Sequence, residues 1–283
     1  MKQKTGIFFL IYTAAAVIIA AIIRFFQYVS VIDFETGFFR KGSEPMGYLI
    51  YIVLAVWTAG LVGLVILGTK KKWTATTVSS AGMGGKATII LGAPYLIAAV
   101  MKVYQLVSAE GGSLFRTIAM VSAALFFAAM GLLLMKSTVP PAVSGFLNIF
   151  PALIMFSQAI ELFMDDLVIK NRSDNLLLLL IYIFATLFFA GCARFYGRIE
   201  TKTSRPREII MAGLVFIFSG THVIAKLLAL AFGGSAVQGM SAISPDAVSV
   251  MLISGAFLAV LCTTEQKLEI EYIIEKKEEK NEE

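Results

Sequence analysis

Four ionisable residues, Arg24, Lys102, Glu161 and Lys226, lie inside long apolar stretches of the sequence. Each stands roughly four to seven residues before the end of its stretch, a depth of about 6–10 Å along a helix. A charged side chain inside a membrane is costly, and it normally faces other helices or a cavity that binds or transports a solute. We therefore expect the four side chains to line one vestibule, whose surplus positive charge would favour a small anionic or zwitterionic solute.

A purely structural role is the alternative for the same residues. Lysine and arginine near a membrane surface can extend their flexible stems to reach it. Glu161 cannot reach so far, but it could pair with a neighbouring Lys or Arg and hold two helices together. Residue type and depth leave both interpretations open.

Three further polar residues accompany the charges at helical spacing. Gln105 follows Lys102 by three positions and Gln158 precedes Glu161 by three, so each pair shares a helix face. His222 lies four residues before Lys226 and is the one histidine in the sequence. A histidine inside a membrane can relay protons, or it can be bonded to a serine or a backbone carbonyl. We include all three among the candidate solute-binding residues.

The sequence offers little support for metal or enzyme chemistry. Asp165 and Asp166 extend the face of Glu161, but one helix end supplies too few oxygen ligands for a hard cation. One histidine cannot form a multi-histidine metal centre, and neither GxSxG nor HExxH occurs. We therefore predict no metal ligands, no cofactor and no catalytic residues.

Composition indicates the elements that must position these residues. Hydrophobic residues make up 58% of the chain and charged residues 15%, and the mean hydropathy is +0.82. Soluble monomers rarely expose so much apolar surface. Eight apolar stretches have about the length that crosses a ~30 Å hydrocarbon core. They predict an all-α, polytopic membrane helix bundle with helices near 6–29, 47–68, 88–108, 115–136, 145–164, 175–197, 209–232 and 246–263.

The distribution of Lys and Arg predicts how the bundle lies in the membrane. Sixteen of them fall on the side that holds both termini and five on the other side. Cytoplasmic loops are enriched in these residues, so both termini are expected in the cytoplasm of a multi-pass plasma-membrane protein. The net charge of +5 is then a topology signal. Because basic residues do not alternate with aromatic ones in a patch, we predict no nucleic-acid partner.

Two further features concern organisation along residues 1–264, which we predict to be one membrane domain. Pro94 and Pro151 begin similar segments, and each odd-numbered helix carries one of the four charges, which suggests four helical-hairpin repeats of parallel orientation. Residues 265–283 hold eight Glu and four Lys and form a charged tail. The tail is either solvated or a docking segment for a cytoplasmic partner.

Three functions remain open on these observations. The intramembrane charges and prolines favour a small-solute transporter or permease with a site near the extracytoplasmic side. The charged tail and short loops fit a non-catalytic sensor, scaffold or complex subunit. A membrane enzyme acting on a lipid-linked substrate is the third, although no nucleophile or metal set is recognisable.

Overall fold

The structure is a computed structural model, and it describes residues 3–34, 39–70, 85–108, 114–136, 140–169, 173–199 and 204–263. Eight α-helices fill most of these ranges, and each is long and apolar enough to cross a membrane. Their bounds are α1 (Gln3–Ser30), α2 (Glu44–Lys70), α3 (Gly85–Ser108), α4 (Leu114–Met135), α5 (Pro141–Ile169), α6 (Ser173–Tyr196), α7 (Ser204–Phe232) and α8 (Pro245–Thr263). A short 3₁₀ helix, η2 (Gly234–Val237), precedes α8.

The predicted all-α membrane bundle is confirmed. The described residues form no strand; an isolated bridge joins Ile32 to Phe39 in the connection between α1 and α2. The predicted and observed helix ends differ most in α5, which begins at Pro141 and ends at Ile169, and in α7, which begins at Ser204. Polar residues in these extra turns lowered the local hydropathy but did not prevent helix formation.

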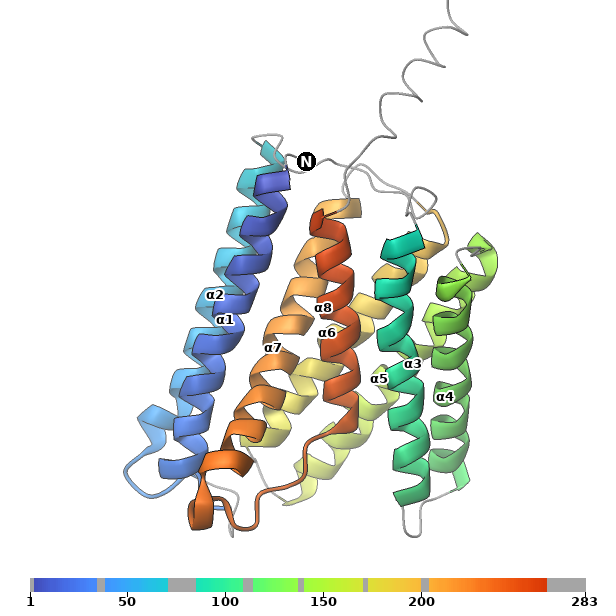
Figure 1. Ribbon diagram of the computed structural model, residues 1–283. Coiled ribbons are helices and arrows are strands. Elements are labelled where there is room, and N and C mark those ends of the chain that lie inside the picture. Colours follow the sequence, from blue (N-terminus) through green and yellow to red (C-terminus); the bar gives the residue numbers. More distant parts are fainter. Residues whose placement is uncertain are drawn as a thin grey trace, which may run out of the picture.

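The helices form a bundle with α7 and α8 near its centre (Figure 1). Of the most apolar windows, 67% of residues in α7 and 61% in α8 are buried, whereas α2 buries 22%. In Figure 1, α1 and α2 lie on one side of this central pair and α3 and α4 lie on the other. We call the end where α1 begins and α8 finishes the terminal end. The opposite end, with residues 31–34 and 233–244, is the far end.

Large apolar side chains on the outer helices point away from the bundle. Ile52 of α2, Val100 of α3, Leu125 of α4 and Leu187 of α6 are all exposed. In water such a surface would be unfavourable, but lipid tails solvate it. The surface therefore agrees with a membrane environment.

Helices α3 and α4 pack closely because glycines face each other. A Cβ added to Gly92 would lie 2.9 Å from the backbone oxygen of Gly131, and one added to Gly131 would lie 3.1 Å from that of Gly92. Small residues at such a crossing let two membrane helices approach backbone to backbone. The α3–α4 hairpin therefore behaves as one packed unit.

Pro94 and Pro151 lie inside α3 and α5, as predicted. Each proline lacks an amide hydrogen, so one carbonyl of the preceding turn loses its helical hydrogen bond. The four-hairpin repeat to which we assigned them stays a prediction.

Candidate functional site

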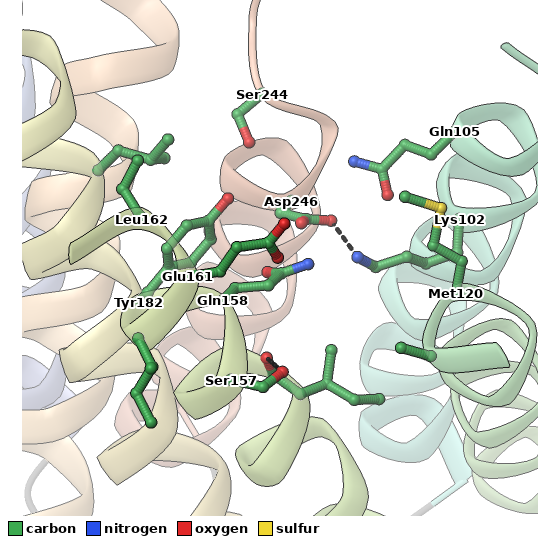
Figure 2. Close-up of a pocket in the computed structure, with 14 residues that line it drawn as sticks. Lys102, Gln105, Met120, Ser157, Gln158, Glu161, Leu162, Tyr182, Ser244 and Asp246 are labelled. Atoms are coloured by element: carbon green, nitrogen blue, oxygen red, sulfur yellow. Dashed lines mark hydrogen bonds and ion pairs between the residues drawn. The ribbon is translucent and has the colours of Figure 1, made fainter. Parts of the chain in front are cut away.

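A cavity of about 610 Å³ lies between the α3–α4 hairpin and the α5–α6 hairpin, with the start of α8 behind it (Figure 2). Its polar lining comes from five elements. These residues are Lys102 and Gln105 of α3, Ser157, Gln158 and Glu161 of α5, Tyr182 of α6, Ser244, and Asp246 of α8. Four of the seven predicted site residues are therefore brought together here.

An ion pair joins α3 to α8 at this cavity. Lys102 Nζ lies 2.5 Å from Asp246 Oδ1, and the two side chains are 1% and 4% exposed. Asp246 occupies the first turn of α8, where the helix dipole favours a carboxylate. Pro245 fits the first helical position, and Ser244 Oγ accepts a long hydrogen bond of 3.4 Å from the Ala247 amide. The sequence Ser-Pro-Asp thus starts α8 and aims Asp246 at the cavity.

Two amide side chains leave acceptor atoms open at the same cavity. The Oε1 atoms of Gln105 and Gln158 are buried and have no hydrogen-bond partner among the described residues. Buried polar atoms normally find a partner, in the protein, in water or in a ligand. Both glutamine side chains line the cavity, and a small rotation of either amide would present an unpartnered oxygen to a solute or to water.

Glu161 completes the lining, and its carboxylate points toward the centre in Figure 2. It is exposed, and no ion pair joins it to a Lys or Arg in the described ranges. The expected pairing of Glu161 with a neighbouring cation is therefore not observed. Lys102 balances Asp246, so Glu161 leaves the charged lining residues with a net charge of −1.

A polar bridge joins α3 to α5 on the terminal-end side of the cavity. Tyr95 OH donates to Asn148 Oδ1 at 2.7 Å, and both side chains are buried. Tyr95 precedes Lys102 by seven residues, so it lies on the same helix face about 10 Å nearer the terminal end. The bridge therefore joins the two cavity-lining helices α3 and α5 on the terminal-end side of the cavity.

The other three predicted residues lie in a second site, around Asp174 in the first turn of α6. Arg24 of α1 is fully buried, and its Nη2 lies 3.4 Å from Asp174 Oδ1. Arg24 Nη1 donates to Ser173 Oγ at 2.8 Å, and its guanidinium lies 4.8 Å from the ring centre of Tyr28. Tyr28 OH donates to Asp174 Oδ1 at 2.6 Å. These contacts fasten α1 to α6.

Lys226 of α7 holds the second oxygen of the same carboxylate. Its Nζ lies 2.7 Å from Asp174 Oδ2 and donates to Ser241 Oγ at 2.9 Å and to the carbonyls of Ser241 and Ala242 at 3.3 Å. Lys226 therefore joins α6, α7 and the connection that leads to α8. Lys226 does not extend its stem to the surface of the bundle, since its side chain is 2% exposed.

His222 lies one turn before Lys226 and is fully buried. Its Nδ1 is 3.6 Å from Asp174 Oδ1, and neither ring nitrogen has a hydrogen-bond partner among the described residues. The expectation of a histidine bonded to a serine or a carbonyl is therefore not met there. His222 instead faces a carboxylate across a gap too long for a hydrogen bond.

The four intramembrane charges consequently do not share one vestibule. Lys102 and Glu161 line the cavity, whereas Arg24 and Lys226 surround Asp174. We predicted one charge on each odd-numbered helix, yet the carboxylates that pair with the two lysines come from even-numbered helices, Asp174 from α6 and Asp246 from α8. Both aspartates stand at the edge of an apolar stretch, where a charge is ordinary, so sequence alone gave no signal of their burial.

Metal binding finds no support in the described residues. No three His, Cys, Asp or Glu side chains gather there in a way that could hold a metal ion. The side chains of Asp165 and Asp166 and the tail 265–283 lie outside the described residues.

No protein-family model, curated protein or solved structure matches the chain. Its class therefore follows from the helices themselves. Eight apolar, membrane-length helices define a multi-pass membrane protein.

Proposed function

We propose that the protein is a small-solute transporter or permease that binds its solute in the cavity between α3, α5 and α8. The observation that carries this proposal is the cavity lining. A Lys–Asp pair, two glutamines whose oxygens lack a partner among the described residues, and a carboxylate without an ion pair there line one space of about 610 Å³. Binding sites of this size combine an apolar wall with a few convergent polar groups that orient the ligand.

The charge of the lining narrows the solute class. By themselves, the three cations Arg24, Lys102 and Lys226 favour an anionic or zwitterionic solute. Because Asp246 balances Lys102, the unpaired Glu161 leaves a net negative site that favours an ammonium group. We therefore propose a zwitterionic solute whose ammonium group contacts Glu161 and whose carboxylate contacts Lys102.

Orientation in the membrane is part of the same proposal. The excess of Lys and Arg at the terminal end supports a cytoplasmic location for it in the plasma membrane. The cavity would then lie in the extracytoplasmic half, and the Tyr95–Asn148 bridge would block passage toward the cytoplasm. Such one-sided closure is what an alternating-access carrier requires in one of its states.

The test compares three small probes on the purified protein in detergent. Glycine carries both charges, ethylammonium only the positive one and acetate only the negative one. We expect glycine to raise the unfolding temperature most, because a ligand of the native state stabilises it in proportion to its affinity. Stabilisation by acetate alone, or by none of the probes, would contradict the proposed solute class.

Glu161→Gln should weaken the effect of glycine by about tenfold in apparent affinity, equal to about 1.4 kcal/mol. Glu44→Gln is the matched control, because Glu44 is an exposed carboxylate at the far end that does not line the cavity. Uptake of labelled glycine into proteoliposomes then separates a permease from a non-catalytic sensor or subunit. Binding without uptake would favour the sensor.

A further inference from the structure

His222 is a basic group of the Asp174 site whose ring nitrogens have no hydrogen-bond partner among the described residues. His222 Nδ1 faces Asp174 Oδ1 at 3.6 Å, while Tyr28 OH and Arg24 Nη2 reach that same oxygen at 2.6 and 3.4 Å. The imidazole therefore stands next to the carboxylate without bonding to it. Adding a proton to Nδ1 would create a donor directed at this oxygen.

The other charged and polar groups at or near His222 come from five helices and one connection. Helix α1 contributes Arg24 and Tyr28, and α6 contributes Asp174. On α7 itself, Lys226 lies one turn away, and Ser241 accepts from Lys226. Tyr51 of α2 donates to the carbonyl of Ser173, at the edge of the site. In α8, Asp246 is paired with Lys102 at the cavity.

Charge balance decides which group must respond to a proton. With a neutral imidazole, Arg24 and Lys226 already outnumber Asp174 by one positive charge. A second excess charge in a buried site is unfavourable unless a cation leaves. Arg24 is fixed by Ser173, Gln27 and Tyr28. Lys226 has a flexible stem and contacts the connection, so it is the cation that can move.

A movement of Lys226 would displace the backbone of the connection, and this displacement would extend to the residues that line the solute cavity. Lys226 Nζ holds the oxygens of Ser241 and Ala242. Ser244 and Asp246, a few residues further on, line the cavity, and Asp246 pairs with Lys102. Four residues, 241–244, therefore connect the Asp174 site to the cavity, and α8 begins directly after them at Pro245.

A small pocket provides a route for the proton. It has a volume of about 90 Å³ and is lined by Tyr28, Ser173, Asp174 and Ser241, among others. The Asp174 side chain is 20% exposed, whereas His222 is fully buried behind it. Water in this pocket can deliver a proton to the carboxylate and from there to the imidazole.

We propose that His222 is a reversible proton-binding residue, and that its protonation transfers Asp174 from Lys226 to the imidazolium and releases residues 233–244 from α7. One proton passes from water to Nδ1, and no covalent bond other than this N–H bond is formed. The release frees the start of α8 and so changes the position of Asp246 in the cavity. This rests on the proposed transport function in one respect: the proton would be its coupling ion.

The first experiment observes the proton directly. Because the sequence holds one histidine, ¹⁵N-histidine labelling gives a single imidazole in the NMR spectrum of the full chain in detergent. We expect this signal to change from the neutral to the protonated pattern as the pH falls from about 8 to about 3.5, a range wide enough for a buried imidazole. A signal that stays neutral over the whole range would overturn the proposal.

The second experiment follows the connection by hydrogen–deuterium exchange, expressed as protection factors so that the intrinsic pH dependence of exchange cancels. Protection of residues 233–244 should fall at least about tenfold as the imidazole becomes protonated, equal to about 1.4 kcal/mol. His222→Gln should abolish the fall, and Glu44→Gln should keep it. An equal fall in His222→Gln would overturn the proposal. Neither readout requires solute binding, so loss of the transport proposal would leave this one standing.

Discussion

Two lysine–aspartate pairs lie toward the far end of the bundle, and they are built alike. Each joins a lysine from an odd-numbered helix to an aspartate in the first turn of an even-numbered one: Lys226 to Asp174, and Lys102 to Asp246. Their surroundings differ. Asp174 also binds Tyr28 and Arg24, whereas Asp246 faces a cavity.

This difference distinguishes a pair that fastens several helices together from the pair at which we propose that a solute binds. In one case, which we call the enclosed pair, side chains of α1 and α7 contact both oxygens of the carboxylate. In the other, which we call the cavity-facing pair, the lysine and the aspartate line a cavity of about 610 Å³. The enclosed pair has partners for both carboxylate oxygens. The cavity-facing pair leaves room for a third charged group. A chemical pair therefore does not define a site until its neighbours are known.

The largest expected effect concerns the enclosed pair. Asp174→Asn removes the one carboxylate that balances Arg24 and Lys226, and an uncompensated buried charge costs about 3–5 kcal/mol. We expect the free energy of unfolding in detergent to fall by that amount, measured by thermal or denaturant unfolding. Asp246→Asn should cost less, because it leaves one cation, Lys102, without its carboxylate, whereas Asp174→Asn leaves both Arg24 and Lys226 without theirs. Equal losses in the two variants would erase the distinction between the pairs.

The next effect tests whether the cavity-facing pair depends on its packed hairpin. Gly92→Ala places a Cβ against the backbone oxygen of Gly131, and overpacking of this kind costs about 1–3 kcal/mol. We expect a lower unfolding temperature and weaker glycine binding, because α3 and Lys102 shift together. Gly63→Ala is the control, since nothing lies within 4 Å of its added Cβ. A destabilised variant with unaltered binding would show that the cavity does not rely on this contact.

A smaller effect is expected where the enclosed pair meets the connection to α8. Ser241→Ala removes the hydroxyl that accepts from Lys226 at 2.9 Å, but the carbonyls of Ser241 and Ala242 remain. Loss of a hydrogen bond to a charged group costs about 1.5 kcal/mol or somewhat more. Hydrogen exchange of residues 233–244 should accelerate accordingly. Ser235→Ala, in η2, is the control variant, because Ser235 accepts no hydrogen bond from Lys226. If exchange accelerates equally in Ser235→Ala, the cause is general loosening of the connection and not the loss of the Lys226 contact.

The smallest change in stability is expected when both members of the cavity-facing pair become apolar. Lys102→Met with Asp246→Leu should alter the free energy of unfolding by about 1 kcal/mol or less, because replacing a buried pair by apolar groups is often nearly neutral. Glycine stabilisation should nevertheless disappear. Retained glycine stabilisation in a folded double variant would exclude this pair from the binding site.

The fold was predictable because membrane-length apolar stretches determine helices almost independently of their neighbours. The depth of Lys102 and Lys226 followed from their distance to the helix ends. Depth is a coordinate along the membrane normal, however, and it contains no information on which helices are lateral neighbours. For this reason the sequence placed both lysines in one vestibule, and the structure places them in two sites.

The two aspartates show the second limit of prediction. The sixth helix was expected to begin at residue 175, one position after Asp174, and Asp246 was the first residue of the eighth. A carboxylate at such a boundary is normally hydrated. Its burial here arises from tertiary contacts with α1, α3 and α7, which hydropathy does not encode.

Pro94 and Pro151 give the two cavity-lining helices α3 and α5 a point at which they can bend. Lys102 lies eight residues beyond Pro94, an arm of about 12 Å, and Glu161 lies ten residues beyond Pro151, an arm of about 15 Å. A bend of about 5° at either proline, where helices kink most readily, displaces the charged residue by about 1 Å. That displacement is enough to make or break a hydrogen bond to a solute. Small angular changes in the middle of the bundle are thereby converted into a change of fit at the far end.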